Sequence, residues 1–213
     1  MSSSCVIFDL DGTLVDSETL GSQALLDLLP ELGEPLPIIS ERYRGQRMAN
    51  IVADIETRLG KKLPDNFEDE YREYAASKIE AELRPMPGVV AMLNQLHLTR
   101  CVASSAPKAK IQLALNVCGL ASFFGSDVFS CYEIGAWKPD PAIFRHAAQA
   151  MNVTAEHCVV VEDSDVGVSA ATAAGMRVLR YDPVGSYSSS DSVQSFAHMD
   201  QLLGLIVSIN DSR

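Results

Sequence analysis

Two aspartates stand two positions apart, directly after an apolar run near the start of the chain. Asp9 and Asp11 follow residues 5–8 in the segment Asp-Leu-Asp-Gly-Thr. Residues two apart on an extended segment face the same side, so both carboxylates can point to one place, and Gly12 frees the backbone to turn away. Two carboxylates about 4 Å apart repel by about 1 kcal/mol in water and about 4 kcal/mol at an effective dielectric constant of about 20. The pair therefore predicts a site at which a proton or a cation is shared.

A second acidic pair, Glu162 and Asp163, follows the apolar run at residues 158–161. Open α/β sheets bind ligands beyond the carboxyl ends of their strands, so we expect this pair at the same rim as Asp9 and Asp11. Four carboxylates at one rim require a divalent cation. Their oxygen atoms, together with a need to neutralise phosphate, favour Mg²⁺ over zinc.

Hydroxyl and ammonium groups follow two further segments. The run at residues 101–103 ends in Ser104 and Ser105, whose hydroxyl and backbone N–H groups suit the oxygens of an anion. A serine at this place can equally cap a helix that begins near Pro107. Lys138 precedes a proline-rich turn that fixes the chain direction. It is either solvent-exposed or directed to the rim.

The apolar runs predict the elements that position these groups. They are continuous, without alternation of apolar and polar residues, which is typical of strands covered on both faces in a parallel sheet. The runs lie at residues 5–8, 101–103, 158–161 and 178–179, and helical patterns lie between them at 107–117, 141–151 and 166–174. We therefore expect an α/β fold whose core is a Rossmann-like, doubly wound parallel sheet.

Between the first run and Pro85 the chain shows helical periodicity and no strand pattern. The periodic stretches lie at 20–29, 48–59 and 67–83. This length is too great for a single crossover and predicts an inserted domain. We expect an α/β core domain made of residues 1–15 and 84–213 and an inserted α-helical domain made of residues 16–83.

Residues 16–82 contain 15 acidic and 8 basic residues, and so carry most of the negative charge of the chain. Against this background Arg42, Arg44 and Arg47 cluster around Gly45. The cluster is either a solvated turn between helices or a contact to an anionic ligand.

Composition excludes several classes of protein. With 213 residues and 47% hydrophobic residues the chain can bury a sizeable core. A formal charge of −11 opposes binding to nucleic acid or to an anionic membrane. No stretch approaches the roughly 20 apolar residues of a membrane span, and the first residues do not resemble a signal peptide. Five cysteines without a C-x-x-C pair are typical of a reducing compartment, so we expect a cytoplasmic protein.

The ordered motifs resemble those of the haloacid dehalogenase-like hydrolases. They are D-L-D-G-T at 9–13, a serine at 104 that ends a strand, K-P at 138–139 and E-D-S-x-x-G at 162–167. A helical insert after the first motif is similar to the cap of the subfamily that includes phosphoglycolate phosphatases and β-phosphoglucomutase. The stretch 131–153 resembles in particular the bacterial 6-phosphogluconate phosphatases.

The resemblance implies a role for each motif. Asp9 is the expected nucleophile, and Asp11 the expected acid that protonates the leaving alkoxide and then the base that deprotonates water. Ser104 and Lys138 are expected to hold phosphoryl oxygens. The implied Mg²⁺ ligands are Asp9, Asp11 through its backbone carbonyl, Asp163 and Glu162, the last of which alternatively orients Lys138. Expected substrate contacts are Ser105, Arg44, Gly45 and Arg47.

These roles predict an Mg²⁺-dependent phosphatase that acts on a small phosphorylated metabolite through an aspartyl-phosphate. A sugar phosphate or a sugar-acid phosphate, such as 6-phosphogluconate, is the expected substrate, and the protein is expected to be a monomer or a weak homodimer. Dehalogenase activity is disfavoured because a halide leaving group does not need the proton of Asp11. A β-phosphoglucomutase-like phosphoryl transferase is disfavoured because Gly21 aligns with the cap histidine of that enzyme.

A non-enzymatic alternative is a phospho-acceptor module of the receiver type or a ligand-binding relative. In receiver domains the acid pair precedes the lone acceptor aspartate and no insert intervenes. Here D-x-D comes first and the second acid pair comes last, which favours the hydrolase.

Overall fold

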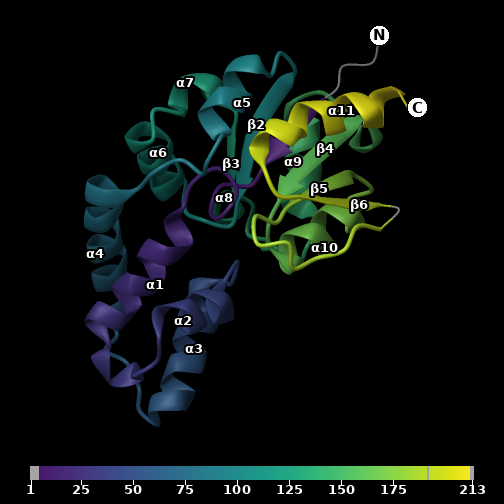
Figure 1. Cartoon of the computed structure of the whole chain (residues 1–213). Coiled ribbons are helices and arrows are strands. Elements are labelled where there is room, and N and C mark those ends of the chain that lie inside the picture. Colours follow the sequence, from purple (N-terminus) through teal and green to yellow (C-terminus); the bar gives the residue numbers. More distant parts are fainter. Residues whose placement is uncertain (1–4, 191, 212–213) are drawn as a thin grey trace.

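The structure is a computed structural model that describes residues 5–190 and 192–211. Its centre is a sheet of parallel strands in the order β3-β2-β1-β4-β5-β6 (Figure 1). The strands are β1 Cys5–Phe8, β2 Thr99–Ser104, β3 Val128–Ser130, β4 Cys158–Glu162, β5 Arg177–Tyr181 and β6 Val193–Phe196. The chain order reverses beside β1, as expected for a doubly wound sheet.

The two central strands are apolar on both faces because helices cover both faces. In β1, Val6 and Phe8 belong to one apolar cluster, whereas Cys5 and Ile7 belong to another on the opposite face. All of β1 and β4 is buried. This explains why both strands read as continuous apolar runs in the sequence.

Helices form the outer layers. One face of the sheet packs against α5 Val89–Gln95, α6 Lys108–Val117, α7 Ala121–Phe124 and α11 Leu202–Asp211. The other face packs against α9 Ala142–Ala150 and α10 Asp165–Ala173. A single turn, α8 Cys131–Ile134, follows β3, and short 3₁₀ turns lie at Pro30–Leu32, Ala155–His157 and Met199–Gln201. No helix in the described part of the chain is long and apolar enough to span a membrane.

The predicted helical insert is present and lies to one side of the sheet (Figure 1). Its helices are α1 Ser17–Leu28, α2 Leu36–Tyr43, α3 Met48–Leu59 and α4 Phe67–Glu82. A third apolar cluster is built entirely from insert residues, Ile39 and Ile55 among the most buried of them. The chain enters and leaves through adjacent segments, since Val15 and Pro85 form an isolated β-bridge.

Candidate active site at the sheet rim

The carboxyl ends of β1 and β4 bring three of the four predicted carboxylates together. Asp9 follows β1, and its backbone N–H donates to the carbonyl of Val161 at 2.9 Å, which extends the pairing of the two strands. Glu162 ends β4 and Asp163 follows it. Asp9, Glu162 and Asp163 are buried, and one oxygen from each lies within 4.8 Å of the others. The predicted common rim is therefore present for these three residues.

Lys138 lies inside this cluster and not in solvent. Its ammonium group forms an ion pair with Asp9 and a second one with Glu162 Oε1 at 2.8 Å, and its side chain is 2% exposed. Burial raises the pKa of Asp9 well above its usual value, Lys138 opposes this effect, and the charges of Glu162 and Asp163 add to it. Although burial disfavours its charge, the carboxylates of Asp9 and Glu162 raise the pKa of Lys138. Lys138 is thus a fixed cation beside Asp9.

Glu162 is held from its other side by the start of α10. Its Oε2 accepts the backbone N–H of Ser164 at 2.7 Å and the Ser164 hydroxyl at 3.0 Å. The Ser164 hydroxyl in turn accepts the N–H of Gly167 at 3.1 Å and so caps the helix. A Cβ atom on Gly167 would fall 1.9 Å from Glu162 Oε1. The E-D-S-x-x-G spacing thus builds a rigid cradle for one carboxylate.

Asp163 faces the turn that follows β1. Thr13 Oγ1 donates to its Oδ1 at 3.1 Å, and Arg44 Nη1 lies 3.3 Å from its Oδ2. Gly12, at φ +84°, leaves room for this carboxylate, because a Cβ there would lie 2.4 Å from Oδ2. Burial and the charge of Glu162 raise the pKa of Asp163 to about 8.

The buried carboxylates fit a divalent cation that prefers oxygen ligands. Asp9, Glu162 and Asp163 offer carboxylate oxygens close enough to share one ion, and their mutual repulsion favours a cation between them. The acidic cluster is therefore compatible with a bound divalent metal ion. The backbone carbonyl of Asp11 is the fourth predicted ligand, and the carboxylate of Asp11 is not part of this cluster.

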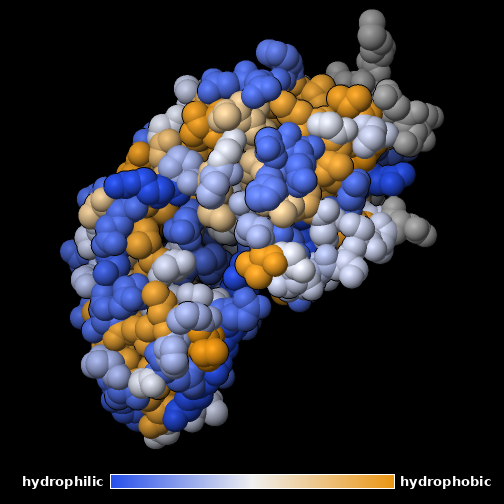
Figure 2. All heavy atoms as spheres, viewed as in Figure 1, coloured by the Kyte–Doolittle hydropathy of each residue, from blue (hydrophilic) through white to orange (hydrophobic). Residues whose placement is uncertain are grey.

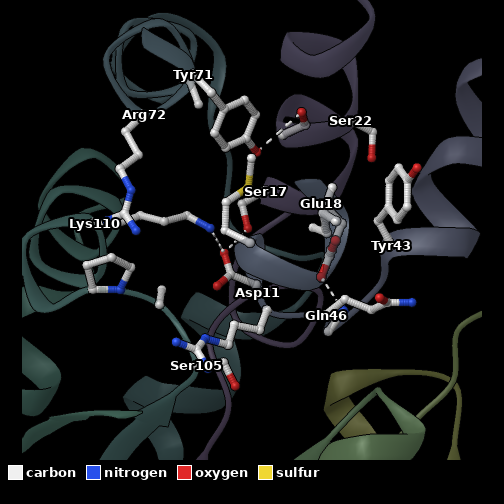
Figure 3. Close-up of a pocket in the computed structure, with 18 of the residues that line it drawn as sticks. Asp11, Ser17, Glu18, Ser22, Tyr43, Gln46, Tyr71, Arg72, Ser105 and Lys110 are labelled. Atoms are coloured by element: carbon white, nitrogen blue, oxygen red, sulfur yellow. Dashed lines mark hydrogen bonds and ion pairs between the residues drawn. The ribbon is translucent and has the colours of Figure 1, made fainter. Parts of the chain in front are cut away.

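The carboxylate of Asp11 instead faces the insert (Figure 3). Its Oδ1 accepts the hydroxyl of Ser17 and the ammonium group of Lys110, the latter at 2.8 Å. Burial works against the charge of Asp11, but Lys110 and Ser17 lower its pKa overall. Sequence reasoning missed Lys110, because it is an isolated lysine on a helix and no motif marks it.

The two predicted serines behave differently. Ser104 ends β2, is buried, and accepts the backbone N–H of Ala106 at 3.0 Å. Its hydroxyl proton stays available for an acceptor. Ser105 lines the cavity beside the rim (Figure 3).

A cavity of about 360 Å³ lies between the rim and the insert. Figure 2 shows the surface hollowed between these two parts of the molecule. The core contributes Asp9, Asp11, Ser105, Lys110, Tyr132, Lys138 and Glu162, and the insert contributes Glu18, Gly21, Tyr43, Gly45, Arg47, Tyr71 and Arg72. The rim carboxylates and the insert therefore face one cavity.

The predicted arginine cluster divides between two places. Arg47 lines the cavity, and its guanidinium carbon lies 3.9 Å from the centre of the Trp137 ring. Gly45 also lines it and donates its N–H to Glu18 Oε1 at 3.2 Å. Arg44 does not line the cavity but pairs with Asp163 and, at 3.1 Å, with Glu41.

A further arginine that sequence reasoning missed reaches the cavity from α4. Arg72 lies over the ring of Tyr132 at 5.2 Å and donates to its hydroxyl at 3.0 Å. Its spacing within α4 resembles that of any charged residue on a solvated helix face. Only the packing of the insert against the core reveals its position.

The doubly wound sheet, with an acid pair after its first strand and a lysine between buried carboxylates, defines an α/β protein with an acidic site at the carboxyl edge of its parallel sheet. The chain belongs to the haloacid dehalogenase-like hydrolases, since the model of that family matches residues 4–175. This confirms the family that the ordered motifs predict.

Known proteins of this family resemble the chain over nearly its whole length. A 6-phosphogluconate phosphatase from Escherichia coli is 35% identical over 202 residues, which cover 92% of this chain and 91% of that protein. A crystal structure of a haloacid dehalogenase-like protein from Agrobacterium tumefaciens has a TM-score of 0.83 at 29% identity and covers 98% of this chain and 100% of that one. A β-phosphoglucomutase from Clostridium difficile has a TM-score of 0.82 at 21% identity, covering 99% and 98%, and shows the shared fold.

Proposed function

We propose that the protein is an Mg²⁺-dependent phosphatase that hydrolyses a small phosphorylated metabolite, with a sugar phosphate or sugar-acid phosphate as substrate and 6-phosphogluconate as the leading candidate. The placement of Asp9 carries the proposal, because a carboxylate buried between Lys138 and two further acids suits a nucleophile. The named activity of the E. coli relative supports the substrate class.

The proposed reaction uses two carboxylates that line the cavity, those of Asp9 and Asp11. An oxygen of Asp9 attacks phosphorus in line, the bond from phosphorus to the leaving oxygen breaks, and Asp11 gives that oxygen its proton. Asp11 then takes a proton from the water that attacks the aspartyl-phosphate, and inorganic phosphate leaves Asp9 unchanged. Asp11 suits this role because its side chain lines the cavity outside the buried cluster.

Positive charge and hydroxyl donors hold the phosphoryl oxygens. Lys138 provides a fixed ammonium group next to Asp9, and Ser104 has a hydroxyl proton to donate. Asp9, Asp163, Glu162 and the backbone carbonyl of Asp11 are the proposed Mg²⁺ ligands, although Glu162 already binds Lys138. When bound, Mg²⁺ supplies positive charge that offsets the charge on the phosphoryl oxygens.

The insert, residues 16–83, acts in this proposal as a cap domain on the core formed by 1–15 and 84–213. Its separate apolar cluster and its position over the rim support this role. Gly45 and Arg47, with Ser105 of the core, contact the part of the substrate beyond phosphorus. Arg44 pairs with Asp163 in the structure, and in this proposal it contacts the substrate after exchanging that partner. A cytoplasmic location and a monomeric or weakly dimeric state belong to the same proposal.

The lining of the cap favours hydrolysis over phosphoryl transfer between sugars. Position 21 is a glycine beside the Tyr71 hydroxyl, which would lie 3.0 Å from an added Cβ, so the cap offers a phenol and no imidazole at this place. The hydroxyl of Tyr71 itself points toward the Gly21 carbonyl at 3.4 Å.

A phosphate-release assay tests the proposal. Wild-type protein with Mg²⁺ should release phosphate from p-nitrophenyl phosphate and from members of a panel of sugar phosphates, 6-phosphogluconate included. Asp9→Asn should abolish release from every substrate, whereas Asp65→Asn, at an exposed residue of the insert, should not. Absence of phosphate release across the whole panel would refute the phosphatase and favour a binding function.

A further inference from the structure

We propose that Lys110 is a positioning residue for Asp11, whose carboxylate it holds so that one oxygen stays directed to the leaving alkoxide of the substrate. This inference rests on the proposed phosphatase function and adds to it a residue outside the four family motifs. The cavity, the hydrogen bonds of Asp11 and the place of α6 all support it.

Lys110 reaches Asp11 from a different part of the fold. It lies in the first turns of α6, a helix that covers the sheet and also contacts α4 of the insert. Its ammonium group stands 2.8 Å from Asp11 Oδ1, and both side chains line the cavity. The side chains are 38% and 18% exposed, so the pair is partly shielded from water. An ion pair in this setting is stronger than one on an open surface.

The contacts leave one oxygen of Asp11 for the reaction. Ser17 and Lys110 both bind Oδ1 (Figure 3). Because Lys110 of α6 and Ser17 of α1 hold Oδ1, Oδ2 is the oxygen that can meet the leaving group. Two donors on one oxygen also fix the plane of the carboxylate, which orients the proton on Oδ2.

The same contacts give Lys110 and Asp11 different parts in the reaction. Lys110 binds Oδ1, and the proton for the leaving oxygen is carried on Oδ2. Lys110 therefore acts on the reaction only through Asp11.

A positioning role of this kind depends on the leaving group. A sugar alkoxide needs a proton as its bond to phosphorus breaks, whereas p-nitrophenolate is stable without one. Loss of Lys110 should therefore slow cleavage of a sugar phosphate much more than cleavage of p-nitrophenyl phosphate. A merely structural role would slow both substrates alike.

The same helix offers a matched control. Lys108 is also a lysine in the first turn of α6, but its ammonium group pairs with Glu133 at 3.0 Å on the surface, and the side chain is 42% exposed. Lys108→Met changes the same charge on the same helix without touching Asp11.

The experiment measures kcat and KM for four proteins, which are the wild type, Lys110→Met, Lys110→Arg and Lys108→Met. Each protein is assayed on two substrates. One is p-nitrophenyl phosphate, and the other is 6-phosphogluconate or another sugar phosphate that the wild type hydrolyses. Lys110→Met should lower kcat/KM for the sugar phosphate by about tenfold or more, a modest part of the effect of a general acid, and change kcat/KM for p-nitrophenyl phosphate less than about threefold. We compare kcat/KM because kcat also includes the hydrolysis of the aspartyl-phosphate, which is common to both substrates. Lys110→Arg should restore most of the loss, and Lys108→Met should resemble wild type.

Equal losses on both substrates, or no loss on either, would overturn the role of Lys110 while leaving the phosphatase intact. Absence of hydrolysis by the wild type would instead refute the proposed function, and this inference with it. Circular dichroism and thermal unfolding of each variant show whether it folds, and the ratio of the two kcat/KM values within one folded variant does not depend on the amount of active protein.

Discussion

Arg47 of the insert lies over the ring of Trp137 of the core, with its guanidinium carbon 3.9 Å from the ring centre. Trp137 directly precedes Lys138, the cation beside Asp9. The same ring meets Tyr132 edge to face at 5.3 Å, and Tyr132 receives Arg72. Two arginines of the insert therefore rest on one aromatic pair of the core, next to the rim that holds the carboxylates.

This contact makes Arg47 the best-placed residue for the distal end of an anionic substrate. Arg47→Ala should raise KM for 6-phosphogluconate by about tenfold, the loss of about 1.4 kcal/mol, and change KM for p-nitrophenyl phosphate little. Trp137 is the single tryptophan of the chain, so its emission should also change in this variant. Arg42→Ala is the control, because Arg42 pairs with Glu34 away from the cavity. A similar rise in KM for both substrates would count against a specificity role.

The cradle around Glu162 predicts a stability effect. Gly167→Ala should lower the free energy of unfolding by about 1–3 kcal/mol, since a Cβ at this position would meet the buried Glu162 carboxylate at 1.9 Å. Gly204→Ala is the matched control: it lies in α11 with no atom within 4 Å of the added Cβ, and should stabilise the protein by about 0.5–1 kcal/mol. Urea unfolding measures both. An unchanged midpoint for Gly167→Ala would contradict the tight packing.

A metal shared by the carboxylates should stabilise the folded protein. Mg²⁺ at about 100 times its dissociation constant should add about 2.7 kcal/mol to the free energy of unfolding of the wild type. Asp163→Asn should remove most of this gain, because Asp163 supplies one of the three buried carboxylates. Thermal unfolding with and without Mg²⁺ measures the gain, with Asp65→Asn as the exposed control. Equal gains in wild type and Asp163→Asn would show that the ion binds elsewhere.

Glu18 predicts a pH dependence of stability. Burial and the charge of Asp11 raise its pKa from 4.5 to about 7 in the folded protein. Between pH 4.5 and pH 7 the folded state binds the proton of Glu18 more tightly than the unfolded state does. Glu18 therefore stabilises the fold fully below about pH 4.5, and this stabilisation is lost as the pH rises through 7. Glu18→Gln should reduce the fall in stability between pH 5 and pH 7.5, by up to about 3 kcal/mol. Urea unfolding at the two pH values tests this, and an unchanged fall in Glu18→Gln would refute it.

The sequence predicts the sheet rim because the acidic pairs follow continuous apolar runs, and parallel strands end at a common edge. The runs that became β1, β2, β4 and β5 carry this signal. The strands that became β3 and β6 do not, since both lie at the sheet edges and are only partly buried. Edge strands need less apolar sequence because only part of their surface is covered.

The positions of Lys110 and Arg72 could not be predicted, for a different reason. Each is an isolated cation on a helix, and its contact with Asp11 or Tyr132 depends on how the insert packs over the core. The expected arginine cluster is likewise a group of neighbours in the sequence. In the structure, the turn between α2 and α3 separates its members, so that Arg44 contacts Asp163 and Arg47 contacts Trp137. Local patterns locate the rim, and tertiary packing decides which cations reach it.

The direct test of the account is to identify the residue that carries the phosphoryl group. Wild-type protein mixed with substrate and Mg²⁺, quenched in acid and reduced with borohydride, should yield homoserine at position 9, detected by tandem mass spectrometry of the peptide that contains Asp9. Modification at another residue, or continued turnover in Asp9→Asn, would contradict the assignment of Asp9 as nucleophile.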